Sequence, residues 1–369
     1  MKYLCHLTAP VTTTFSADNY RGEPRWERNV CDALTTYGKH VHTTRPIWNS
    51  ALDKPFNFHN GPNTEWLDDS VLISYGVEKQ IYTGSFPEDL EIPYRIIQYF
   101  DGPTEATKDT FFQYLREKPQ SIICTYSFKT WEYEKRLHNV LGKENCEWVI
   151  GPTVPCVDES ADNFRKPTLF WAYRNFLNYL ENDPAGMDRL FGKVHSIMAG
   201  NPEFQLKILI HLNYGDLHKE AAGSNGLDWF LNLPFGKRFL PFKDRIELIW
   251  NVHWSKMLSL MKETSLIISP AEPLGGPPFE AAIYGIPTVF SNESNAFTDR
   301  DRMPFFPELL MAPKGINNRF LDLISALHED HLLYTACGNA IRNFTKANAT
   351  YEAYVKKIES ITQARGWNV

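Results

Sequence analysis

Residues 265–290 constrain the fold of this chain most, because an apolar run is followed by a loop rich in proline and glycine, a short helix and a second strand. Residues 265–268 are typical of a parallel strand that is buried on both faces. Gly276 suits the N-cap of the next helix, and Gly285 is expected to end it before a strand that begins at Pro287. This order places backbone N–H groups at a helix N-terminus, which suits a phosphate.

Two glutamates flank this loop, Glu272 and Glu280. Carboxylates beside an anion site need partners other than phosphates, and hydroxyl donors such as a ribose or a sugar ring are the natural candidates. Two simpler interpretations stay open. Glu280 could merely favour a helix N-terminus, and Glu272 could be an ordinary loop acid.

The segment Glu272 to Val289, EPLGGPPFEAAIYGIPTV, resembles the donor-site signature of family-4-type retaining glycosyltransferases with the GT-B fold, E-x-F-G-x-x-x-x-E-A-x-x-x-G-x-P-V-V. The resemblance implies an α/β protein with two Rossmann-like domains and a donor cleft between them. It implies that Glu280 binds the ribose and that Glu272 binds a hydroxyl of the donor sugar. It also implies that the diphosphate meets the N–H groups near Leu274, Gly275 and Gly276.

The length of 369 residues allows two domains with separate cores. We expect an N-terminal, Rossmann-like, acceptor-side domain at residues 1–155 and a C-terminal, Rossmann-like, nucleotide-sugar-binding domain at residues 156–350. Residues 351–369 form an amphipathic pattern, and the resemblance implies a helix that packs back on the N-terminal domain. Residues 47–69 are rich in Pro, Asn and Asp and are expected to be irregular.

The N-terminal domain contributes two candidate site residues. Gly22 lies before the first predicted helix, where the family often has two adjacent glycines, so Gly22 is a candidate donor-binding residue or simply part of a capping loop. Asp101 follows a predicted strand at residues 94–100, and ligands of open α/β sheets gather at the carboxyl ends of strands. Many relatives have a histidine there. Asp101 could orient a hydroxyl or accept the acceptor's proton, or it could form an ordinary Asp-Gly turn.

The cations expected beside the diphosphate are only partly recognisable. Relatives end the first strand of the second domain in Gly-Arg, with a lysine about five residues later. Arg174 fits the arginine, but the lysine position falls near Tyr179. A second cation is therefore expected from the basic segment 235–245, with Lys237 and Arg238 as candidates. That segment could equally be a solvated loop.

Composition limits the remaining function classes. The net charge of −6 mildly disfavours a DNA partner, although a local basic patch would reverse that judgement. The six cysteines lack the spacing of a zinc site and indicate reduced thiols. The first residues are too polar for a signal peptide. No apolar run reaches the length of a membrane span. We therefore expect a cytoplasmic protein without a transmembrane segment. The D-x-D at residues 299–301 is interpreted as loop charge, so no metal is expected.

The resulting hypothesis is a retaining hexosyl or pentosyl transfer from a nucleoside-diphosphate sugar, with a UDP-sugar favoured. Glu272, Asp101 and Arg174 are the candidate catalytic residues, and no cofactor is required if protein groups stabilise the leaving diphosphate. The hydroxyl acceptor is a glycan, a lipid-linked sugar, a metabolite or a hydroxymethylated DNA base. Two alternatives remain: a nucleotide-sugar epimerase on the same fold, and a non-catalytic relative that binds the nucleotide-sugar.

Overall fold

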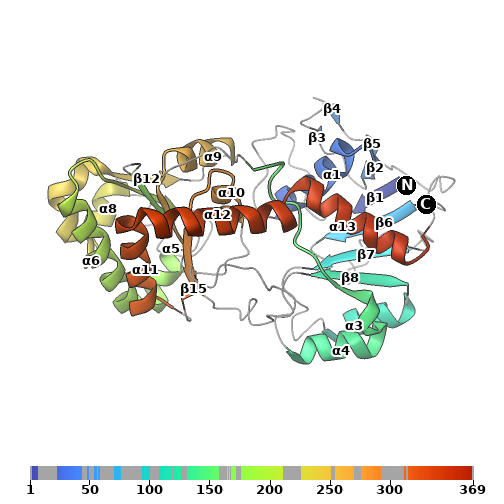
Figure 1. Ribbon diagram of the computed structural model, residues 1–369. Helices are drawn as coiled ribbons and strands as arrows, with labels where there is room; N and C mark the ends of the chain where they lie inside the picture. The colour runs from blue at the N-terminus through green and yellow to red at the C-terminus, as the bar shows by residue number, and fades with distance from the viewer. Residues whose placement is uncertain are drawn as a thin grey trace. The chain divides into compact units, whose positions relative to one another are not determined.

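The structure is a computed structural model, and it describes residues 2–6, 23–43, 48–49, 54–55, 57–58, 70–75, 94–99, 108–118, 120–125, 131–157, 164, 166, 168–171, 176–210, 226–250, 254–269, 276–291, 311–312 and 315–367. The chain divides into two compact units (Figure 1). Unit 1 consists of Met1–Cys156 and Lys346–Val369, and unit 2 consists of Val157–Thr345. Each unit is an α/β unit with a parallel main sheet.

Unit 1 contains a seven-stranded sheet in the order β5-β2-β1-β6-β7-β8-β9. Its strands are β1 (Lys2–His6), β2 (His40–Thr43), β5 (Asn57–Phe58), β6 (Ser70–Tyr75), β7 (Tyr94–Tyr99), β8 (Ser121–Thr125) and β9 (Cys146–Trp148). Its helices include α1 (Glu23–Thr36), α3 (Lys108–Glu117), α4 (Trp131–Leu141), the 3₁₀ turn η2 (Lys143–Asn145) and α13 (Tyr351–Ala364).

The region expected to be irregular, residues 47–69, contains short strands instead. The strands β3 (Trp48–Asn49) and β4 (Lys54–Pro55) pair antiparallel, and β5 pairs with β2 at the edge of the main sheet. Each of these strands has two residues, which is too short to show the alternating pattern by which strands are recognised in a sequence.

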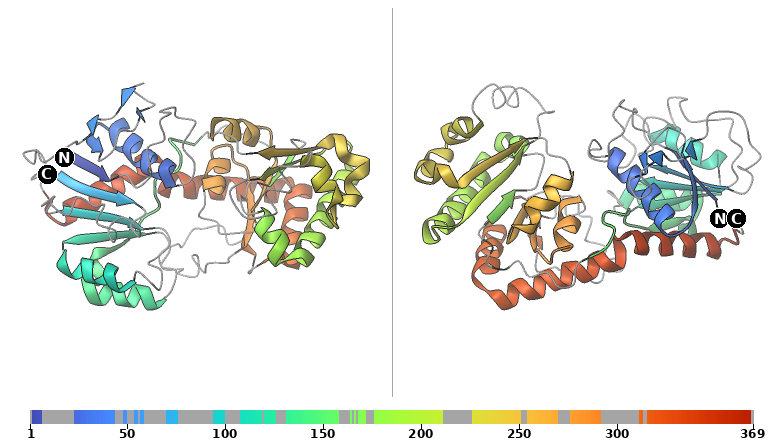
Figure 2. Two further views of the ribbon diagram at one scale, coloured as in Figure 1. Left: turned by 180° about the vertical axis from the view of Figure 1, so that it is seen from behind. Right: turned by 90° about the horizontal axis from the view of Figure 1, so that it is seen from above.

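The central strand β1 explains the two cores of unit 1, because successive side chains of a strand point to opposite faces. Tyr3 and Cys5 join a core with residues of α1 and α13, whereas Leu4 joins a second core with residues of α3 and α4. Figure 2 shows these two pairs of helices on opposite sides of the sheet. The sheet is therefore covered on both faces, as a parallel sheet requires.

The helix α13 is joined to unit 1 by hydrogen bonds as well as by apolar packing. The Tyr351 hydroxyl bonds to Asn29 Oδ1 at 3.2 Å, and the Tyr354 hydroxyl bonds to Gln98 Oε1 at 3.0 Å. Thr350 accepts a hydrogen bond from Ala353 N and so caps the helix. The helix α13, near the end of the chain, thus completes a core that begins at β1.

Unit 2 contains a six-stranded sheet in the order β12-β11-β10-β13-β14-β15. Its strands are β10 (Thr168–Trp171), β11 (Gln205–Ile210), β12 (Ile246–Trp250), β13 (Leu266–Ser269), β14 (Thr288–Ser291) and β15 (Met311–Ala312). Within its described residues the helices are α5 (Phe176–Asn182), α6 (Pro184–Gly200), α8 (Gly226–Asn232), the 3₁₀ helix η3 (Gly236–Arg245), α9 (Trp254–Lys262), α10 (Gly276–Ala282), α11 (Asn318–Glu329) and most of α12 (His331–Asn348).

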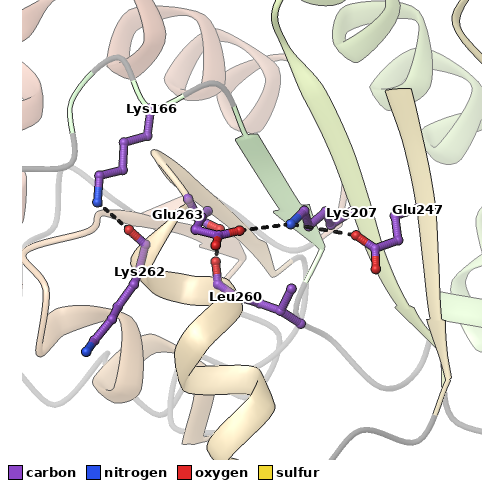
Figure 3. Close-up of polar contacts among 7 residues, drawn as sticks. Lys166, Lys207, Glu247, Leu260, Lys262 and Glu263 are labelled. Atoms are coloured by element: carbon purple, nitrogen blue, oxygen red, sulfur yellow. Dashed lines mark hydrogen bonds and ion pairs between the residues drawn. The ribbon is translucent and has the colours of Figure 1, made fainter. Parts of the chain in front are cut away.

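Helices cover both faces of this sheet too. Residues of α9 and α10 share a core with strand residues, namely Leu209, Ile249 and Ile267. The helices α6 and α11 pack together, and α11 contacts β13 and β14. A polar cluster lies beside α9, where Lys207 of β11 pairs with both Glu263 and Glu247 (Figure 3).

Two further observations concern the chain as a whole. Among the residues that the structure describes, no helix combines the length and the apolarity needed to cross a bilayer. All six cysteines lie within the described ranges, and they are present as thiols.

Candidate functional site

The strand order of unit 2 reverses between β10 and β13. From β10 the chain proceeds outward through β11 to β12, and from β13 it proceeds in the opposite direction through β14 to β15. Such a reversal is a topological switch point, and ligands of open α/β sheets bind outside the carboxyl ends of the strands at this point. The geometry therefore directs attention to the segments that follow β10 and β13.

Two predicted site residues come a few positions after these strands in the sequence. Trp171 of β10 is the register partner of Ile268 of β13, so the two strands end side by side. Arg174 comes three residues after Trp171, and Glu272 comes four residues after Ile268. Arg174, Glu272, Leu274 and Gly275 themselves lie outside the described residues, and their roles stay predictions.

The second glutamate, Glu280, is described, and it is 0% exposed. It lies in α10 between the buried residues Phe279 and Ala281. Carboxylates are seldom fully buried, because removing a charge from water is costly unless protein groups replace the water. A glutamate that served only a surface helix end would remain solvated. The burial of Glu280 therefore shows that it is not a solvated residue of a surface helix end, and its binding of a ribose stays a prediction.

The local structure around Glu280 has the predicted form. The helix α10 begins at Gly276 itself, one residue earlier than an N-cap glycine would imply. It ends in a turn in which Gly285 N bonds to Ala282 O at 3.1 Å. Gly285 has a φ of 66°, a conformation that favours glycine. The strand β14 then starts at Thr288, one residue after the proline expected to open it.

The basic segment 235–245 lies along the edge of the sheet. The 3₁₀ helix η3 leads into the edge strand β12 and packs on α6. The Arg238 guanidinium pairs with the Asp188 carboxylate, and Lys237 is exposed. Three strand spacings separate β12 from β13, which corresponds to roughly 14 Å. The described contacts of Arg238 are structural, and the donor-binding role of Lys237 and Arg238 stays a prediction.

Tyr179, near which the resemblance places a lysine, is a core residue. It is buried in α5, and its carbonyl accepts a hydrogen bond from Asp183 N at 2.8 Å. The position therefore supplies packing where relatives have a charge.

Of the candidates in the N-terminal domain, one follows β1, which borders a switch point, and the other follows β7, which lies two strands from β1. In unit 1, β1 lies between β2 and β6, so the strand order reverses there. Gly22 belongs to the segment between β1 and α1, and Asp101 comes two residues after the end of β7. Both residues lie outside the described ranges, as do residues 299–301. Within the described ranges, no group of three or more His, Cys, Asp or Glu side chains is arranged to hold a metal ion.

Sequence reasoning missed a buried polar group in α1, the helix that follows β1. Arg28 and Asp32 form a buried ion pair at 3.2 Å, and the neighbouring Asn29 donates to Thr153 O at 3.2 Å. The signal was present, since opposite charges four residues apart on a helix face each other. It was obscured because the same pattern is common on solvated helix faces.

Comparisons with known proteins address the fold. No protein-family model and no curated protein matches the sequence. Among solved structures, the chain is similar to a glycosyltransferase from Rickettsia africae, with 11% identity, 98% of each chain covered and a TM-score of 0.58. It is similar to Anabaena HepE in complex with UDP, with 12% identity, 99% of this chain and 100% of HepE covered, and a TM-score of 0.61.

A third similar structure, TarM, is longer than this chain. The match has 12% identity and a TM-score of 0.52, and it covers 88% of this chain but only 61% of TarM. At these identities the comparisons bear on the fold, and they agree with the two parallel α/β units and their switch points. The family-4 subtype stays a prediction. The chain has the GT-B fold of the glycosyltransferases to which it is similar.

Proposed function

We propose that this chain is a glycosyltransferase that moves a sugar from a UDP-sugar to a hydroxyl acceptor. One observation carries the proposal: β10 and β13 end side by side at the switch point of unit 2, directly before Arg174 and Glu272. The buried Glu280 lies in the helix that follows β13. The donor class is supported by HepE, which has been solved in complex with UDP and glucose.

Each candidate residue has a chemical task in this proposal. The Glu280 carboxylate accepts hydrogen bonds from ribose hydroxyls, and Glu272 accepts one from the donor sugar. Arg174 and the N–H groups near Leu274, Gly275 and Gly276 stabilise the charge on the departing diphosphate. Protein groups then do the work of a metal ion, so we propose metal-independent transfer.

The reaction exchanges one bond at the anomeric carbon for another. The bond from this carbon to the phosphate oxygen breaks, and UDP leaves with the electron pair. A bond from the acceptor oxygen forms, and the acceptor proton passes to a base, for which Asp101 or the leaving phosphate is available. Retention of configuration, by attack on the face that the diphosphate leaves, is proposed from the resemblance of residues 272–289 alone.

Donor binding is tested with a matched pair of variants. We expect UDP and UDP-sugars to raise the melting temperature of the native protein with increasing concentration, more than the other nucleoside diphosphates do. Glu280→Gln removes the charge and keeps the shape, and it should weaken UDP binding about 10- to 100-fold, the value of hydrogen bonds to a charged group. Glu329→Gln, at an exposed position of α11, is the control and should bind like the native protein.

Turnover is measured separately with UDP-sugars, with and without a panel of hydroxyl acceptors. Release of UDP that depends on an acceptor supports a transferase. Conversion of the donor to an isomeric UDP-sugar without any acceptor would identify an epimerase instead. UDP binding without turnover under any condition would favour the non-catalytic alternative.

A further inference from the structure

The helix α12 lies unusually close to the turn that ends α10. A Cβ atom added to Gly338 of α12 would lie 2.3 Å from the carbonyl oxygen of Gly285. Ordinary contacts of a Cβ atom begin near 3.4 Å, so a residue larger than glycine would force the two backbones about 1 Å apart. Glycine at position 338 is therefore what allows this approach.

A second contact joins the same two helices. Phe344 of α12 stacks on Phe279 of α10, with 6.3 Å between ring centroids and 15° between ring planes. Both rings belong to buried residues. Phe279 directly precedes Glu280, and Gly285 ends the turn that follows it, so the two contacts of α12 bracket the glutamate in the sequence.

The bracketed segment has little freedom to adjust. Besides the bond from Gly285 N to Ala282 O, three hydrogen bonds close the turn, from Ile283 N to Glu280 O at 3.3 Å, from Tyr284 N to Ala281 O at 3.0 Å, and from Ile286 N to Ala281 O at 3.2 Å. Gly285 has a positive φ, a conformation that other residues rarely adopt, so the turn is closely defined at this position. A displacement at Gly285 is therefore transmitted to the carbonyl of Glu280.

The other partner, α12, is itself firmly packed. Its side chains Tyr334, Cys337, Ile341 and Thr345 are buried, and Phe164 packs on Tyr334 with ring centroids 5.1 Å apart. Figure 2 shows α12 as one continuous helix beside α10. The helix can thus act as a rigid support for the shorter α10.

We propose that α12 positions Glu280, and that Gly338 and Phe344 are the positioning residues through which it does so. The inference rests on the proposed function, because it assigns them a purpose in holding the carboxylate that would bind the donor. Neither residue contacts the donor in this proposal, and each acts through the backbone or the ring of α10.

The test compares two Gly→Ala substitutions in helices of unit 2. Gly338→Ala introduces the clash, whereas at Gly200, the last residue of α6, an added Cβ meets nothing within 4 Å. The two ligand-free variants are compared with the native protein by hydrogen exchange with mass spectrometry. We expect Gly338→Ala to speed exchange of the amides of residues 280–286 about tenfold or more, with little change in the peptides of α6 or of the unit 1 sheet. Gly200→Ala should leave residues 280–286 unchanged.

Affinity for UDP is the second measurement. A misplacement of about 1 Å in a binding group commonly costs one to two orders of magnitude, so Gly338→Ala should weaken UDP binding about tenfold. Phe344→Leu keeps an apolar side chain and should weaken UDP binding about two- to threefold. If Gly338→Ala does not fold, Phe344→Leu decides both measurements.

The outcomes separate the two proposals. Unchanged exchange of residues 280–286 in folded Gly338→Ala, or exchange that rises equally throughout unit 2, would overturn the positioning role. Native protein that binds no UDP, with exchange altered locally as expected, would overturn the proposed function and leave the positioning of α10 supported.

Discussion

The two units share a plan but are completed differently. Each has a parallel sheet whose strand order reverses beside its first strand. Unit 2 is built from one continuous segment, Val157–Thr345, whereas unit 1 needs Lys346–Val369 to cover one face of a sheet that begins at Lys2. Unit 2 is thus completed by strands and helices that follow one another in the sequence, whereas unit 1 is completed by a segment from the distant end of the chain.

Two groups of polar contacts, one in each unit, differ in how far their partners are exposed. In unit 1, Tyr351 and Tyr354 of α13 make buried hydrogen bonds to Asn29 and Gln98. In unit 2, Lys207 pairs with Glu247 and Glu263, whose side chains are 55% and 65% exposed (Figure 3). A buried partner that is lost leaves an unsatisfied group, whereas an exposed partner is rehydrated. The hydrogen bonds of α13 in unit 1 therefore depend on geometry more strictly than the Lys207 ion pairs of unit 2 do.

The largest effect is expected from deleting residues 351–369. The deletion removes the apolar contacts of Tyr354, Val355, Ile358 and Ile361, together worth on the order of 10 kcal/mol, which is comparable to the whole stability of a domain. Unit 1 should lose its protection from hydrogen exchange, and the peptides of unit 2 should keep theirs. Loss of protection in both units alike would contradict the comparison.

A smaller effect is expected from Tyr354→Phe, which leaves Gln98 Oε1 buried without its hydroxyl donor. The free energy of unfolding of unit 1 should fall by about 1–3 kcal/mol. The double variant Tyr354→Phe with Gln98→Met removes both polar groups and should recover much of the loss. Tyr37→Phe, on a side chain that is 41% exposed, is the control in urea denaturation. No recovery in the double variant would show that packing, and not the hydrogen bond, sets the cost.

The substitution Lys207→Met tests how much the polar cluster of unit 2 contributes to stability. The substitution replaces a charged strand residue by an apolar one of similar length, and both glutamates can be solvated afterwards. We expect the free energy of unfolding of unit 2 to change by less than about 1 kcal/mol. The same denaturation experiment checks this value. A loss as large as that of Tyr354→Phe would mean that the Lys207 cluster, despite its exposed glutamates, depends on geometry as strictly as the buried hydrogen bonds of α13 do.

The smallest effect concerns pH. Burial lowers the pKa of His328, which packs edge-on against Phe204 with ring centroids 5.1 Å apart, while the nearby Glu329 acts in the opposite direction. Between the lowered pKa and the usual pKa, His328 is protonated in the unfolded chain but neutral in the folded unit. The stability of unit 2 should therefore fall as the pH is lowered through about 6.5, the usual pKa of histidine, and level off below the lowered pKa. Denaturation between pH 5 and 8 should show this slope in the native protein and a weaker slope in His328→Gln.

Much of the fold was predictable because local patterns carry it. The apolar run before residue 269 and the spacing of residues 276–285 indicated a strand followed by a short helix and a second strand, and the structure has β13, α10 and β14 in this order. The GT-B fold class was correctly predicted from the resemblance of this segment. The two-residue strands of residues 48–58 were missed, since so short a pairing leaves no periodic signal.

The sequence by itself determined that Glu280 lies in a short helix after a buried strand, because turn chemistry and helical spacing act over a few residues. Only the tertiary structure decided that β10 and β13 lie next to each other, with Ser265, the residue before β13, bonded to the carbonyl of Thr168 97 positions away. It alone brought Gly338 against Gly285 and α13 onto the sheet of unit 1. Strand order and helix packing depend on hydrogen bonds and close contacts between distant segments. No local sequence pattern specifies which segments come into contact.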